Sequence, residues 1–166
     1  FILEEDGNLS EQILHEFQGM NLSYAPRIWS TNTAKNALNL LTSRNFDLII
    51  IMLRIADTDP ISFSKNIKLS YPEIPIVLLA FDESEIQQLH NKHTKYINDI
   101  FIWSGNSNIF PAIIKNYEDH KNIARDIEIG DVRTILLIED TPRNYSNLLP
   151  VLYKEIIFQT KELMDK

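Results

Sequence analysis

The stretch FDLIIIMLRIADTDP, residues 46 to 60, decides the fold of this chain. An apolar run reaches Leu53 and then enters a loop that contains Asp57 and Asp59. A near-continuous apolar run of this kind is typical of a parallel strand that is covered on both faces. In α/β proteins, functional sites lie at the carboxyl ends of such strands. The residue nearest to that end is Met52, which carries no reactive group of the usual kind.

Three further apolar runs have the same strand character, and helical patterns separate the runs. The predicted strands cover residues 26–29, 47–53, 75–81 and 99–103, and the predicted helices cover residues 8–17, 33–41, 60–70, 83–93 and 107–123. Asp59 before Pro60 indicates a helix start, because it combines an N-cap with proline at the first helical position. The alternation of strands and helices predicts an α/β fold with a doubly wound parallel sheet.

The last part of the chain has a different character. Residues 124–131 are short, charged and contain Gly130, which indicates a linker after a first domain at residues 1–123. VRTILLIED, residues 132–140, predicts another apolar strand that ends in two acids. A long helix is expected at residues 142–164, with Pro150 as the place for a kink. We therefore interpret residues 132–166 as the first strand and helix of a second module.

Composition excludes several classes of function. The chain has 166 residues, no cysteine and a formal net charge of −7. Disulfides, thiolate nucleophiles and Cys-based zinc sites are therefore excluded, and a large nucleic-acid surface is disfavoured. No apolar run approaches the roughly 20 residues that span a bilayer. Four glycines leave no place for a Rossmann or P-loop fingerprint. We expect a cytoplasmic protein without nucleic-acid or membrane partners.

The order of these elements resembles the receiver domain of two-component response regulators. FDLIIIMLRIADTDP, PIVLLAF and INDIFIW are similar to the third, fourth and fifth strands of that family, and the resemblance covers roughly residues 25–120. It implies a flavodoxin-like sheet. The family accepts a phosphoryl group from a histidine kinase on an aspartate at the tip of its third strand.

The resemblance also implies that the phosphoryl chemistry of the family is lost here. The acceptor aspartate falls on Met52, the switch hydroxyl on Ala80 and the strand-five lysine on Trp103. A thioether cannot form an acyl phosphate, and magnesium prefers hard oxygen ligands over sulfur. A methyl group and an indole cannot replace the hydroxyl and the ammonium group. We expect a pseudo-receiver with no catalytic residue, which is not an enzyme by itself.

Several acidic residues remain as candidates for a cation site. Receivers place two acids at the end of the first strand, but Glu4, Glu5 and Asp6 follow too few apolar residues to fit that pattern, so the first strand is expected upstream. Together with Asp57 they form a candidate acidic pocket.

TILLIEDT fits the strand-one pattern better, with Glu139 and Asp140 as its acidic pair. Magnesium is therefore expected only in the second, incomplete module, and no other metal or cofactor is expected. His90 and His93 lack a third ligand for zinc.

A closer resemblance extends over nearly the whole chain. ILEEDG, LSYAPRI, MLR, YEDH and LLIEDTPRNYSNLLPVLYKEI are similar to the N-terminal part of a group of bacterial proteins. These proteins carry two receiver-like modules ahead of a phosphoenolpyruvate synthase/pyruvate phosphate dikinase nucleotide-binding region. The resemblance implies a regulatory front end, whose parent protein carries an ATP-dependent phosphotransferase region elsewhere.

Three functions remain open from the sequence. The first is a signalling module that docks on a protein partner or on downstream domains of the same chain. The resemblance to receiver domains implies that residues 83–117, with Trp103, form the docking face. Self-association as a homodimer is part of this hypothesis, because a lone strand and helix at residues 132–166 cannot bury their apolar faces. The second is an active phosphoacceptor that uses Asp57 as a displaced aspartate. The third is a sensor that binds a small ligand in the vacated pocket.

Overall fold

The computed structural model describes residues 9–20, 25–89, 94–130 and 133–164. The chain forms two compact units, residues 29–104 and residues 1–28 with 105–166. The elements in chain order are α1 (Leu9–Gly19), α2 (Ala34–Ser43), β1 (Ile49–Met52), α3 (Pro60–Ser70), β2 (Ile76–Ala80), α4 (Glu83–Gln87), the 3-10 turn η1 (Thr94–Tyr96), β3 (Asp99–Ile102), α5 (Ile109–Gly130) and α6 (Pro142–Met164).

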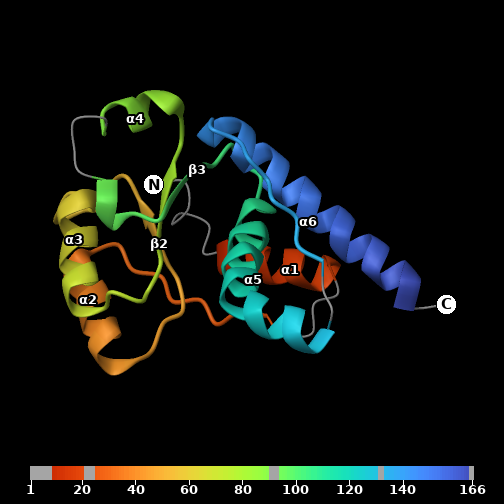
Figure 1. Ribbon diagram of the computed structural model, residues 1–166. Coiled ribbons are helices and arrows are strands. Elements are labelled where there is room, and N and C mark those ends of the chain that lie inside the picture. The colour runs from red at the N-terminus through yellow and green to blue at the C-terminus, as the bar shows by residue number, and fades with distance from the viewer. Residues whose placement is uncertain (1–8, 21–24, 90–93, 131–132, 165–166) are drawn as a thin grey trace. The chain divides into compact units, whose positions relative to one another are not determined.

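The unit of residues 29–104 contains a three-stranded parallel sheet in the order β1-β2-β3. Ile49 pairs with Ile76, and Leu79 pairs with Phe101. All five residues of β2 are buried, as expected for the central strand. Helices α2 and α3 lie along one face of the sheet (Figure 1). The core between them contains Ala34, Leu41, Ile51, Phe63, Ile67, Ile76 and Leu78. The predicted α/β class with a parallel sheet is confirmed.

Polar side chains fix the first turn of the helices in this unit. Asp59 accepts hydrogen bonds from the backbone N–H groups of Ile61 and Ser62, at 3.1 and 3.2 Å, and Pro60 is the first helical residue. The predicted start of this helix is therefore confirmed. Thr33 caps α2 in the same way, because its hydroxyl accepts from the backbone N–H of Asn36 at 3.2 Å.

The other unit contains α1, α5 and α6. The hydroxyl of Tyr153 in α6 donates to Asp119 in α5 at 2.9 Å, and burial, followed by this hydrogen bond, raises the pKa of Tyr153. The hydroxyl of Ser107 donates to Glu16 in α1 at 3.0 Å. Apolar side chains from all three helices are buried, among them Ile13, Phe17, Ile113 and Leu149. Within the described part of the chain, no helix has the length and apolar character needed to cross a membrane.

Some predicted elements differ from the structure in their extent or existence. Residues 26–29 form no strand. Residues 124–130 continue α5 to Gly130, because the run from Ala124 to Ile129 contains neither glycine nor proline and so permits a helix. The division of the chain into residues 1–123, 124–131 and 132–166 as domains stays a prediction.

The predicted strand in the segment VRTILLIED is also wrong. Residues 133–141 have no regular secondary structure. A strand needs a neighbouring strand that hydrogen-bonds to its backbone N–H and C=O groups. No described segment pairs with this one. The long helix predicted after it is confirmed as α6, which continues through Pro150.

Candidate functional site

The three positions singled out by the sequence lie at one edge of the sheet. Met52 is the last residue of β1, and Ala80 is the last residue of β2. Trp103 directly follows β3, and its backbone N–H donates to the carbonyl of Ala80 at 2.8 Å. Because the strands are parallel, their carboxyl ends meet at the same edge. The structure therefore brings together the residues that the sequence placed on separate strands.

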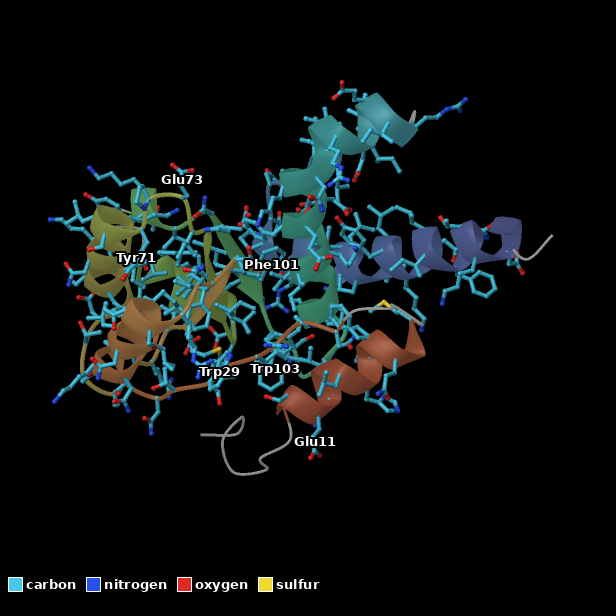
Figure 2. The ribbon with its side chains drawn as sticks, turned by 90° about the horizontal axis from the view of Figure 1, so that it is seen from below. Glu11, Trp29, Tyr71, Glu73, Phe101 and Trp103 are labelled. Carbon is cyan, nitrogen blue, oxygen red and sulfur yellow. The ribbon has the colours of Figure 1, made fainter. Side chains whose placement is uncertain are left out.

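The side chains at this edge are apolar or aromatic. Met52 is partly buried, and the methyl group of Ala80 is completely buried. The Trp103 ring lies against the ring of Phe81, with centroids 5.8 Å apart and planes tilted by 53°. Figure 2 labels Trp103 together with Phe101, a buried residue of β3. None of the three positions presents a carboxylate, a hydroxyl or an ammonium group.

An ion pair that the sequence analysis missed lies beside this edge. Glu85 in α4 accepts from the backbone N–H of Phe81 at 2.8 Å and from the guanidinium of Arg54 at 3.4 Å. The Glu85 side chain is 12% exposed, whereas that of Arg54 is 85% exposed. Asp82 caps α4 by accepting from the N–H of Glu85 at 3.1 Å. An acid followed three residues later by Glu is the capping-box pattern, and it would have pointed to Glu85.

Asp57 holds the start of α2. Its two carboxylate oxygens accept from the backbone N–H groups of Ala34, at 2.7 Å, and Lys35, at 3.2 Å. The hydrogen bond from Ala34 is the largest influence, and it lowers the pKa of Asp57 below the ordinary value of 3.8. Asp57 is therefore a long-range helix cap. The sequence suggested only a loop residue of a candidate acidic pocket. The cap could not be predicted from local sequence, because the residues that donate to Asp57 lie more than 20 positions away in the chain.

The acids before α6 also act at a helix start. Glu139 accepts from the backbone N–H of Thr141 at 3.0 Å, and Asp140 accepts from the hydroxyl of Thr141 at 3.1 Å. The segment before them is not a strand, so they do not end one. Glu4, Glu5, Asp6, His90 and His93 lie outside the described residues. Across residues 9–20, 25–89, 94–130 and 133–164, no three His, Cys, Asp or Glu side chains are grouped to hold a metal ion.

A pocket lies at the opposite edge of the sheet. It is lined by residues 44–46, which precede β1, and by residues 71–74, which precede β2. Tyr71 and Glu73 belong to this lining and are labelled in Figure 2. The Tyr71 hydroxyl donates to the carbonyl of Leu41 at 3.2 Å, which ties the lining to α2. This pocket is therefore separate from the edge formed by Met52, Ala80 and Trp103.

The similarities of this chain to known proteins are similarities to solved structures. No family model and no curated protein matches the chain. The signal receiver domain of an HD domain-containing protein from Pseudomonas fluorescens Pf-5 superposes with a TM-score of 0.51 and 22% identity, over 68% of this chain and 90% of that chain. The chain has a receiver-like fold.

Two further structures agree with this receiver-like fold. One is described as a novel family of redox sensors in the streptococci that evolved from two-component response regulators, with a TM-score of 0.59 and 16% identity over 85% of this chain. The other is NtrX from Brucella abortus in complex with ADP, with a TM-score of 0.57 and 16% identity over 85% of this chain. The receiver-like chain spans 57% and 29% of the lengths of these two structures. At such identities the likeness concerns the fold.

Proposed function

We propose that this chain is a regulatory module of the two-component type that does not accept a phosphoryl group at the usual strand end and acts through protein contacts. The observation that carries the proposal is the set of side chains at the carboxyl edge of the sheet. Met52, Ala80 and Trp103 lie there together, at the carboxyl ends of three neighbouring strands of a receiver-like fold.

The chemistry of phosphoryl transfer explains why this set matters. Formation of an acyl phosphate needs a carboxylate oxygen that attacks phosphorus, and the thioether of Met52 has none. Magnesium would need hard oxygen ligands, which sulfur does not replace. Ala80 has no hydroxyl to bind a phosphoryl oxygen, and the indole of Trp103 carries no charge to pair with one.

The ion pair beside the edge supports the same proposal. Glu85 places a negative carboxylate against the backbone at the end of β2, where it accepts from the N–H of Phe81. A phosphoryl group carries negative charge, so a largely buried carboxylate at this place would repel it. Arg54 already pairs with Glu85 and would have to change partner to bind an anion.

Protein contact is the function that such an edge can still perform. Trp103 is partly exposed, and aromatic residues are frequent anchors of protein interfaces. The resemblance to the N-terminal part of phosphoenolpyruvate synthase/pyruvate phosphate dikinase-like proteins suggests a regulatory front end whose partners are downstream domains of the same protein. In this proposal the chain itself is not an enzyme, and any phosphotransferase chemistry is carried elsewhere.

The test is exposure to a small phosphoryl donor. Wild-type protein is incubated with magnesium and acetyl phosphate, and separately with beryllofluoride, and is analysed by intact mass and by thermal shift. We expect no phosphoryl adduct and no stabilisation, because the acceptor carboxylate is missing. The matched variant is Met52→Asp, which restores a carboxylate at the end of β1 and should respond more than the wild type.

A magnesium-dependent phosphoryl adduct on the wild type would overturn the proposal. In that case Asp57→Asn identifies the acceptor, because loss of the adduct in this variant would make Asp57 a displaced phosphoacceptor. The hydrogen bonds that Asp57 accepts from Ala34 and Lys35 oppose this outcome, since both of its oxygens are engaged at the start of α2.

A further inference from the structure

We propose that the pocket lined by residues 44–46 and 71–74 binds a small organic carboxylate, whose acid group contacts Arg44 and whose apolar body lies against the aromatic and aliphatic side chains of the lining. This pocket lies at the edge of the sheet opposite to the carboxyl edge. The inference does not depend on whether the chain accepts a phosphoryl group, so each proposal can fail without the other.

The pocket has the size of a small-molecule site. Its volume is about 360 Å³, and ligand pockets in proteins span roughly 300–1,000 Å³. Residues 44–46 lead into β1, residues 71–74 lead into β2, and these two strands pair with each other. The walls of the pocket therefore come from the paired side of β1 and not from its outer edge.

The inner wall of the pocket is apolar and continuous with the core. Phe46, Tyr71 and Ile74 are partly buried and pack against the buried cluster between the sheet and its helices. An apolar ligand body that enters such a wall is removed from water, which is favourable. Two aromatic rings and one aliphatic side chain therefore suit a ligand with an aromatic or branched apolar body.

Hydrogen bonds hold the loop before β2 in place. The ammonium group of Lys68 donates to the carbonyls of Pro72, at 3.1 Å, and Ile74, at 2.7 Å. The hydroxyl of Tyr71 donates to the carbonyl of Leu41, near the end of α2, at 3.2 Å. These carbonyls are therefore satisfied by donors of the chain itself. Because the loop is already ordered, ligand binding does not have to order it.

Arg44 supplies the positive charge of the pocket. It is the one basic residue among the described residues of the lining. Its guanidinium lies over the ring of Trp29, with Cζ 3.8 Å from the ring centroid, and Trp29 is 48% exposed (Figure 2). A guanidinium that stacks through its face keeps the N–H donors at its rim, and their planar arrangement matches a carboxylate. In the described part of the chain, no carboxylate forms an ion pair with Arg44.

Glu73 is the one acidic residue among the described residues of the lining, and its charge acts on Lys68. Burial lowers the pKa of Lys68, and the charge of Glu73 raises it. A cationic ligand would therefore compete with Lys68 for Glu73. An anionic ligand meets no such competitor at Arg44. The charges of the pocket thus favour a carboxylate over an amine.

The test compares three compounds that share one apolar body and differ in charge, namely phenylpropionate, phenylpropanol and phenylpropylamine. Each is titrated into the isotope-labelled full chain, and the amide resonances are followed by NMR. We expect phenylpropionate to shift the amides of residues 44–46 and Ile74. It should bind about tenfold more tightly than phenylpropanol, because it adds a charge-assisted contact with Arg44. Phenylpropylamine should bind more weakly than phenylpropionate.

Two variants separate the charge from its placement. Arg44→Gln should weaken phenylpropionate binding about tenfold and leave phenylpropanol binding unchanged. Trp29→Ala keeps the charge but removes the ring that holds it, so it should weaken phenylpropionate binding about threefold. Arg125→Gln, at an exposed position of α5, is the matched control and should change neither affinity. Arg44 and Trp29 are both exposed, and thermal unfolding midpoints verify that each variant is folded.

Several results would contradict the proposal. Equal affinities for phenylpropionate and phenylpropanol would leave an apolar pocket without a carboxylate site. Tightest binding of phenylpropylamine, lost in Glu73→Gln, would make Glu73 the charged contact. Equal losses in Arg44→Gln and Arg125→Gln would show an effect of net charge and not of a site. An absence of shifts at residues 44–46 and Ile74 would overturn the proposed location.

Discussion

Asp57 and Asp59 lie two residues apart and serve two different helices. Asp59 caps the helix that follows it directly, and the sequence Asp-Pro was sufficient to predict this role. Asp57 caps α2, which lies earlier in the chain. The sequence suggested for it a loop position in an acidic pocket or a displaced phosphoacceptor. Only the folded loop shows which backbone N–H groups its carboxylate reaches.

The lowered pKa of Asp57 predicts a pH dependence of stability. A group whose folded pKa is depressed stabilises the protein above its unfolded pKa, and this contribution is lost as the pH falls through the folded value. We therefore expect Asp57→Asn to lower the free energy of unfolding at pH 6 and to have little effect well below pH 3.8. Urea unfolding of both proteins at several pH values measures the difference. A difference that grows as the pH falls would contradict this assignment.

At the scale of an element, the turn after β3 depends on glycine. Gly105 has a φ of +91°, in the region that side chains with a Cβ atom avoid. We expect Gly105→Ala to lower the free energy of unfolding by about 1–2 kcal/mol. The matched control is Gly19→Ala in α1, where an added Cβ meets no atom within 4 Å and alanine favours the helix. Equal urea midpoints for the two variants would contradict this prediction.

Helix α6 carries a proline in its interior, and the element continues through it. Pro150 lacks the N–H group that the helix would use at this position, and proline is about 3 kcal/mol less favourable than alanine there. We expect Pro150→Ala to stabilise the protein by about 1–3 kcal/mol and to increase the helical circular dichroism signal. Pro142→Ala is the control, because proline at the first helical position costs no hydrogen bond. A Pro150→Ala variant whose free energy of unfolding is unchanged or lower would contradict this prediction.

At the scale of the whole molecule, the two apolar segments 76–80 and 135–138 differ in hydrogen bonding and in burial. Strand β2 is hydrogen-bonded to a strand on each side and is completely buried. Residues 135–138 are hydrogen-bonded to no strand in the described part of the chain. We expect the amides of β2 to exchange with deuterium slowest and those of residues 133–141 to exchange fast in dilute protein. Hydrogen-exchange mass spectrometry measures both. Comparable protection of the two segments at low concentration would contradict the prediction.

The sequence alone determined the α/β class, the parallel strands β1 to β3 and the start of α3 at Asp59. These features follow from local periodicity, capping and the order of elements, which are properties of neighbouring residues. Tertiary structure decided the role of Asp57, the Glu85–Arg54 pair and the continuation of α5 through residues 124–130. It also decided that ILLI is no strand in the single chain. Hydrogen bonding between distant segments settles such features, because a strand or a long-range cap exists only where its partner is present.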